Sequence, residues 1–152
     1  MSTRHPISVD SLCRARIAIE GLAAELATDR ATEADLERLE SLIEGETHAD
    51  DTAQAELSVA QNQAFHFRLY RLSGSTVLPP IIEGLWLQIG PFIRKSAEYF
   101  DARDGRGAEF HIAAVEAMRR RDAVRVGRAV AADINRSLDV IREVMFTADA
   151  AA

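Results

Sequence analysis

Residues 62–74 read NQAFHFRLYRLSG, and this stretch decides the fold class because its apolar side chains recur every three or four residues. Such spacing places them on one face of a helix, which we expect to cover residues 52–73 and to end at Gly74. The apolar residues of this face are Val59, Phe65 and Leu69. Asn62 and His66 lie one turn apart on the same face, so the helix directs an amide and an imidazole toward its own core.

Helix patterns of the same kind fill the rest of the chain, and no run of strand-like alternation competes with them. Thr32 with Asp35, and also Asp122, are typical amino-terminal caps, whereas Gly90 and Pro91 are expected to kink or split a helix. The expected helices cover about 10–28, 33–45, 52–73, 79–99, 108–120 and 122–145. We therefore predict an all-α protein, an antiparallel bundle of six or seven helices.

The predicted bundle should form a single domain. A chain of 152 residues is long enough to bury a core without help from a metal or a disulfide. We expect this domain to cover residues 10–146, with an N-terminal tail at 1–9 and a C-terminal tail at 147–152.

Composition excludes several classes of protein. The chain is 47% hydrophobic and 28% charged, which suits a helical globular domain and not a disordered chain. Its formal net charge of −6 argues against direct binding to nucleic acid, which requires a basic face. Cys13 is the only cysteine, and the most apolar stretch, residues 77–93, is shorter than a membrane-spanning helix. With no signal-peptide-like segment, we expect a soluble cytoplasmic protein that does not enter the membrane.

Two further polar side chains lie on apolar faces of the last two predicted helices. His111 lies ten residues before a chain reversal near Arg121, and Asp133 lies twelve residues after it. At about 1.5 Å of rise per residue, both return to a similar height in neighbouring helices. Buried polar groups without a partner are costly. One divalent metal would satisfy Asn62, His66, His111 and Asp133 together, and imidazole with carboxylate or amide oxygen suits zinc, nickel, manganese or iron(II).

Other interpretations of these residues remain open. A buried histidine is more often a hydrogen-bonded core residue than a metal ligand, and an aspartate in the middle of a helix often pairs with arginine. Arg16 lies on an apolar face of the first predicted helix, so it either pairs with Asp133 or clamps the carboxylate of a small ligand. Arg94 is a similar candidate in the fourth predicted helix, although an exposed arginine is the simpler interpretation there.

Five segments together carry a resemblance to a known family. In chain order they are RIAIEGLAAELA (16–27), ATEADLERLESLI (31–43), NQAFHFRLYRLSGS (62–75), EFHIAAVEAMRRRDAVRVGRAV (109–130) and ADINRSL (132–138). Their order and spacing resemble the FCD domain, the effector-binding C-terminal domain of the FadR subfamily of GntR-type bacterial transcription regulators. No single segment is specific enough alone.

The resemblance implies a metal site with two departures from the family pattern. Metal-binding members use an aspartate and a histidine four residues apart on one helix, then two histidines on the last two helices. By position His66 and His111 match, whereas Asn62 stands in place of the aspartate and Asp133 in place of the last histidine. The family also implies a carboxylate effector such as lactate, citrate or a sugar acid, a homodimer, and DNA binding through a winged-helix domain, which we do not find in these 152 residues.

We therefore expect a ligand-sensing domain and not an enzyme. A metal held by the four polar residues would bind a small organic acid, which Arg16 and Arg94 would also contact. One alternative is a metal-dependent hydrolase or oxygenase, because two histidines and Asp133 are also typical ligands in such enzymes. No acid, base or nucleophile stands out to support it. Another alternative is a metal-free dimerisation and effector domain in which Arg16 and Asp133 form a buried pair.

Overall fold

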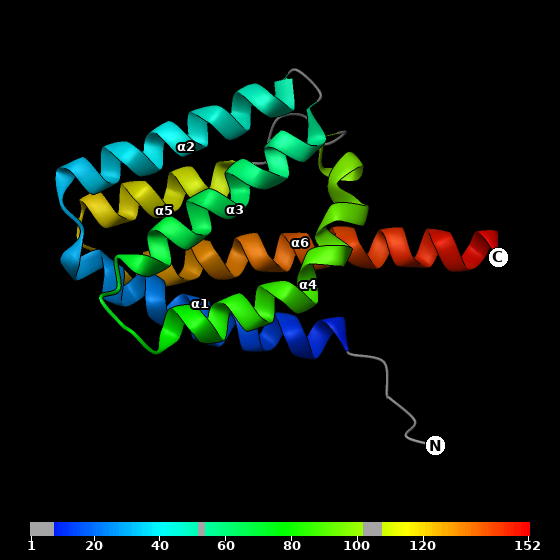
Figure 1. Ribbon diagram of the computed structural model, residues 1–152, viewed down its shortest axis with the longest axis horizontal. Coiled ribbons are helices and arrows are strands. Elements are labelled where there is room, and N and C mark those ends of the chain that lie inside the picture. Colours follow the sequence, from blue (N-terminus) through cyan, green and yellow to red (C-terminus); the bar gives the residue numbers. More distant parts are fainter. Residues whose placement is uncertain (1–7, 52–53, 102–107) are drawn as a thin grey trace.

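The computed structural model describes residues 8–51, 54–101 and 108–152, and over these ranges the chain forms six helices and no strand. The helices are α1 (Val9–Arg30), α2 (Glu33–Asp51), α3 (Ala55–Arg71), α4 (Leu78–Asp101), α5 (Glu109–Arg119) and α6 (Ala123–Ala151). Figure 1 shows that each helix runs opposite to the one before it, so the described part of the chain is an antiparallel bundle. The all-α fold predicted from the sequence is confirmed.

Local sequence signals set several of the helix ends. The Thr32 hydroxyl accepts from the Asp35 amide at 3.2 Å, and the Asp35 carboxylate accepts from the Thr32 amide at 3.0 Å, which is a reciprocal cap at the start of α2. The Asp122 side chain accepts from the Arg125 amide at the start of α6. Gly74, three residues beyond α3, has a φ of 71°, the left-handed conformation that only glycine adopts readily.

Two helices are longer than the sequence predicted. The expected end of the second helix near residue 45 is wrong, because α2 continues to Asp51 and buries Glu46 and Ala49. The expected end of the last helix near Met145 is also wrong, because α6 continues to Ala151 through a segment with no glycine or proline. Figure 1 shows the last turns of α6 extending past the rest of the bundle. The predicted loop at 100–107 and tail at 1–9 lie largely outside the described residues.

Pro91 lies inside α4, which continues through it to Asp101 and is therefore not split. Figure 1 shows α4 changing direction along its length, as expected where proline removes a backbone hydrogen bond. A buried apolar face holds the helix to the bundle across this bend. Its residues are Ile82, Trp86, Ile89 and Ile93. No described helix is both long enough and apolar enough to cross a membrane.

Helices α1 and α4 pack on both α3 and α6. Helix α3 also packs on α2, and α6 also packs on α5. Helices α3 and α6 are not close backbone neighbours in the described structure, but their side chains meet where Nε2 of His66 lies 3.0 Å from Oδ2 of Asp133. The core therefore contains a group of buried polar residues: Arg16, Glu20, Glu46, His66, His111 and Asp133.

Candidate metal centre

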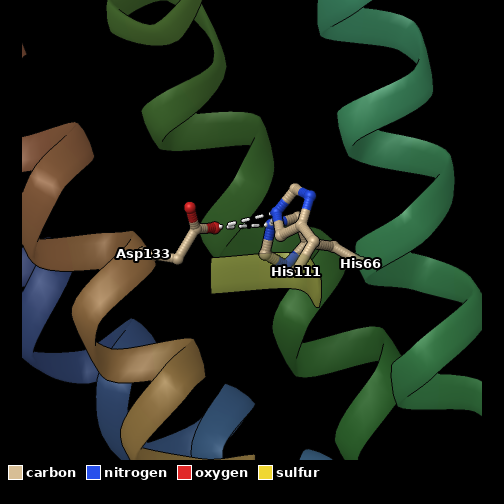
Figure 2. A group of neighbouring side chains, drawn as sticks. All are labelled: His66, His111 and Asp133. Carbon is tan, nitrogen blue, oxygen red and sulfur yellow. Dashed lines mark hydrogen bonds and ion pairs between the residues drawn. The ribbon is translucent and has the colours of Figure 1, made fainter. Parts of the chain in front are cut away.

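His66 from α3, His111 from α5 and Asp133 from α6 point one atom each toward a common centre. The Oδ2 atom of Asp133 lies 3.0 Å from Nε2 of His66 and 3.1 Å from Nε2 of His111. The two Nε2 atoms are 3.1 Å apart. Figure 2 shows the single Asp133 oxygen facing both imidazole rings. The convergence that helix spacing predicted is present, and the three residues form a group that could hold a metal ion.

The helix faces that carry these side chains explain why they converge. Phe65 and Leu69 of α3 are completely buried, and this places His66 on the inner face of the helix with them. The His111 ring stacks on Phe65 with ring centres 4.2 Å apart and an angle of 20° between the planes. Asp133 is buried between Val130 and Ile134 on the inner face of α6. Apolar packing therefore fixes the rings and the carboxylate before any ligand binds.

The outer nitrogen of each imidazole has its own partner. Nδ1 of His111 lies 2.8 Å from the Glu46 carboxylate, which only accepts, so His111 donates its Nδ1–H there. Nδ1 of His66 lies 2.8 Å from the Tyr70 hydroxyl. Metal-binding histidines usually donate their second N–H in this way, which leaves the other nitrogen free to bind the metal. The outer contacts therefore favour Nε2 as the ligand atom in both rings.

Strong electrostatic coupling links the group. Burial alone lowers the pKa of His111, but the charge of Asp133 and hydrogen bonds to Asp133 and Glu46 outweigh it and raise that pKa to about 10. Burial alone would raise the pKa of Asp133, yet the charges and hydrogen bonds of His111 and His66 hold it well below its usual range. Without a metal, a proton on His111 therefore supplies the positive charge between the two carboxylates at neutral pH.

No arrangement of protons turns all three central contacts into hydrogen bonds. If both Nε2 atoms of His66 and His111 carry protons toward Asp133, the two N–H groups face each other; if only one does, a nitrogen lone pair faces the carboxylate. A cation satisfies all three atoms at once. Ligand atoms about 2.1 Å from one metal lie roughly 3.0 Å apart at right angles and roughly 3.4 Å apart at tetrahedral angles. The observed separations of 3.0–3.1 Å fit three adjacent positions around such an ion.

A small cavity of about 50 Å³ adjoins the carboxylate side of the centre. Its lining includes Asn62, Asp133, Arg136 and Ser137, together with Glu46 and Asp50. Asn62 is half-buried and lines the same cavity as Asp133, whereas the two histidines are not part of its lining. The Arg136 guanidinium donates to Oδ1 of Asp133 at 3.3 Å and lies over the Phe110 ring.

The two arginines that we proposed as effector contacts lie elsewhere. Arg16 is buried and its guanidinium donates to both carboxylate oxygens of Glu20, at 2.7 and 3.2 Å, so the alternative in which Arg16 pairs with Asp133 is wrong. The partner lies four residues along the same helix, where the i,i+4 spacing brings the two side chains together. Arg94 is exposed and lines a separate depression with Phe67 and Leu87. A contact of either arginine with an effector stays a prediction.

Sequence reasoning missed three residues of the centre. Glu46 lies just beyond the expected end of the second helix at residue 45, and only its burial in the longer α2 reveals it. Tyr70 follows His66 by four residues, a spacing that could have identified it as a neighbour on the same face. Arg136 follows Asp133 by three residues on α6 and could have been found by the same rule.

Comparison with known proteins identifies relatives of this fold and sequence. The family model described as FCD domain matches residues 11–136. The HTH-type transcriptional regulator McbR of Escherichia coli (strain K12) is 31% identical over 83 residues, which are 55% of this chain and 38% of McbR. A solved structure described as E. coli McbR/YncC matches with a TM-score of 0.83 over 88% of this chain and 67% of that chain, at 24% identity. The aligned sequence thus spans well under half of McbR, and the structural match supports the fold alone.

Proposed function

The chain belongs to the FCD domain family, and from this premise we propose that it is the effector-sensing part of a bacterial transcription regulator of the GntR type. The sequence similarity to McbR, an HTH-type transcriptional regulator, supports the assignment. The proposed signal is a small organic acid that binds to a divalent metal in the middle of the bundle. The observation that carries this proposal is the triangle of His66, His111 and Asp133.

In this proposal the metal is held by four side chains. His66 and His111 contribute Nε2 and Asp133 contributes Oδ2, the three atoms that lie 3.0–3.1 Å apart. Asn62, which lines the adjoining cavity, contributes its amide oxygen. Two imidazoles with oxygen ligands and no thiolate suit zinc, nickel or manganese. The bound ion supplies the positive charge and the open coordination positions to which a carboxylate binds.

The cavity beside Asp133 is the proposed binding place of the acid. Its volume of about 50 Å³ accommodates a carboxylate group and a few further atoms, but no large hydrophobic ligand. Arg136 brings a positive charge to the cavity wall, and Ser137 and Asn62 add groups that donate hydrogen bonds. Because Glu46 and Asp50 line the same cavity, an anion depends on the metal and on Arg136 to offset their charge.

Regulation would follow from the position of the site between helices. An acid that binds more tightly to one arrangement of α3, α5 and α6 than to another shifts the population toward that arrangement. In the proposed regulator this shift reaches DNA through a winged-helix domain outside these residues, and two copies of the chain form a homodimer. The effector belongs to the class of metabolite-sized carboxylates, such as lactate, citrate or sugar acids, and a cavity of about 50 Å³ favours the smallest of these, lactate.

Calorimetric titration of these acids into zinc-loaded and metal-free protein tests the proposal. We expect at least one acid to bind the zinc-loaded protein and to bind the metal-free protein at least tenfold more weakly. The His66→Ala/His111→Ala variant should lose the difference, whereas His48→Ala, which removes an exposed histidine outside the centre, should retain it. Equal binding with and without metal would overturn the metal-dependent mechanism. Conversion of an acid by the metal-loaded protein would favour the enzyme alternative.

A further inference from the structure

Behind the metal centre lies a buried polar network that connects α1, α3 and α4. Glu20 and Tyr70 are completely buried, and Arg16 and Trp86 are nearly so. Each of the four has a polar group in the core and contacts at least one of the others. None of them is needed for the triangle of ligand atoms itself. The network meets the centre at His66, through the hydrogen bond from Nδ1 of His66 to Tyr70 and through the Trp86 ring, whose centre lies 5.3 Å from that of the imidazole.

The Glu20 carboxylate is the fixed point of this network. Trp86 donates its indole N–H to Oε1 at 2.7 Å, and Arg16 donates to Oε2 at 2.7 Å and to Oε1 at 3.2 Å. The Arg16 guanidinium also lies over the Trp86 ring, 4.8 Å from its centre. Three charge-assisted hydrogen bonds in a dry environment leave the carboxylate little freedom.

Tyr70 connects this carboxylate to the imidazole of His66. Burial first, and then the charge of Glu20 and a hydrogen bond to it, raise the pKa of Tyr70 well above 10, so the hydroxyl keeps its proton. A hydroxyl that donates to Glu20 has its oxygen lone pairs available to accept from Nδ1–H of His66, 2.8 Å away. An Nδ1–H held in this way leaves Nε2, the atom that faces His111 and Asp133, as the atom available to a metal.

We propose that Tyr70, oriented by Glu20, is a positioning residue that fixes the tautomer and ring angle of His66 for metal binding. This inference rests on the proposed metal site. A purely structural role explains the network poorly, because a buried ion pair is usually no more stabilising than apolar residues of the same volume. Glu46 holds His111 in the same way. Each imidazole therefore has one partner at its outer nitrogen: Tyr70 of the same helix for His66, and Glu46 of α2 for His111.

The decisive variant is Tyr70→Phe, which removes the hydroxyl and keeps the ring. We expect its zinc affinity, measured by competition with a chromophoric chelator, to fall about 10- to 100-fold, the usual effect of losing an outer partner of a metal-binding histidine. Thr28→Val is the matched control, because it also removes a fully buried hydroxyl, one that donates to the Ala24 carbonyl in α1. It should lower the melting temperature of the metal-free protein to a similar extent without changing zinc affinity.

A spectroscopic measurement separates positioning from loss of stability. In metal-free wild-type protein, nitrogen NMR should show a proton on Nδ1 of His66, and in Tyr70→Phe it should show a mixture of tautomers. Glu20→Gln should weaken zinc binding through the same route, and combining it with Tyr70→Phe should add little. If Glu20→Gln does not fold, the zinc affinity and the NMR spectrum of Tyr70→Phe still test the proposed role of Tyr70.

The outcomes are distinguishable. If wild-type protein binds no zinc, the proposed function and this inference both fail. If wild-type protein binds zinc and Tyr70→Phe binds it equally tightly, this inference fails and the metal site stands. Equal losses of affinity in Tyr70→Phe and Thr28→Val would show that Tyr70 acts only through stability, which also overturns the inference.

Discussion

The contacts of His111 favour a positive charge at this point in the core. Its Nδ1–H is held by Glu46, its Nε2 faces Asp133, and its ring is stacked on Phe65. Two carboxylates therefore face one imidazole in a dry environment, and a proton resides there when no metal does. A metal that takes this place must displace the Nε2 proton, so we infer that metal binding releases protons near neutral pH.

This coupling predicts how the stability of the metal-free protein depends on pH. The pKa of His111 is 6.5 in an unfolded chain and about 10 in the folded protein, so the folded state binds the extra proton between these values. The stabilisation is therefore complete below pH 6.5 and is lost as the pH rises through about 10. Between those limits the free energy of unfolding should fall by up to about 1.4 kcal/mol per pH unit.

Urea denaturation in the presence of a chelator, at pH values from 7 to 9, measures this slope. The matched variant is His111→Gln, which keeps polar groups at the position but cannot titrate. We expect the wild-type slope to be steeper than the slope of the variant. Parallel slopes would show that His111 is not protonated in the metal-free core.

The convergence of three polar side chains was predicted from the sequence, whereas their outer partners were not. His66, His111 and Asp133 are visible because each interrupts an apolar face, and rise per residue is enough to bring His111 and Asp133 to one height. The partner of Arg16 was missed although its spacing could have identified it. Glu20 lies four residues after Arg16 on the same helix, so the rule for i,i+4 pairs favours it over Asp133, which lies on another helix.

Among the helix ends, the turn after α3 depends on a glycine. Gly74 has a φ of 71°, and the side chain of Arg30 lies where a Cβ would be, with its Nε only 2.5 Å from that position. This turn reverses the chain between the helix that carries His66 and α4. A side chain at Gly74 would therefore have two effects: it would strain the backbone, and it would displace the side chain of Arg30.

Gly74→Ala should destabilise the protein by at least about 1 kcal/mol, because a left-handed conformation is unfavourable for alanine. Gly84→Ala is the control: a Cβ at Gly84, inside α4, meets nothing within 4 Å, so alanine should stabilise the helix by about 0.5–1 kcal/mol. Urea denaturation of the two variants should give changes of opposite sign. A Gly74→Ala variant as stable as wild type would contradict this account of the turn.

Helix type was predictable from the sequence, whereas helix length was predictable only where a cap or glycine marks the end. Thr32, Gly74 and Asp122 each mark a boundary that the structure confirms. The segment after Gly45 looked like a connection because it is polar, but burial of Glu46 and Ala49 outweighs that signal. Pro91 did not split α4, because the apolar face on both sides of the proline holds the two parts to the core.

In the molecule as a whole, the centre joins α3 to α5 and α6, two helices that are not among its close backbone neighbours. His66 belongs to α3, which packs on α1, α2 and α4, while His111 and Asp133 belong to the α5–α6 pair. A metal bound to all three would connect these parts, and unfolding would have to break that connection. Metal binding should therefore contribute directly to the stability of the fold.

This connection predicts a large effect of metal on thermal stability. At a free zinc concentration about 100 times Kd, the stabilisation is about 2.7 kcal/mol, which raises Tm by on the order of 5–10 °C in a domain of this size. Calorimetry with zinc and then with excess chelator should show the rise and its reversal. His66→Ala/His111→Ala should show neither, and a zinc effect of equal size in that variant would place the ion elsewhere.

The metal content of the chain, purified without chelator and measured by elemental analysis, tests the central claim most directly. The comparison needs His66→Ala/His111→Ala, which removes two of the converging nitrogens, and His48→Ala, which removes an exposed histidine outside the centre. The account predicts close to one equivalent of zinc, nickel or manganese in wild type and in His48→Ala, and little in the double variant. No metal in wild type, even after these ions are added back, would contradict it and leave the three residues as a proton-bridged core.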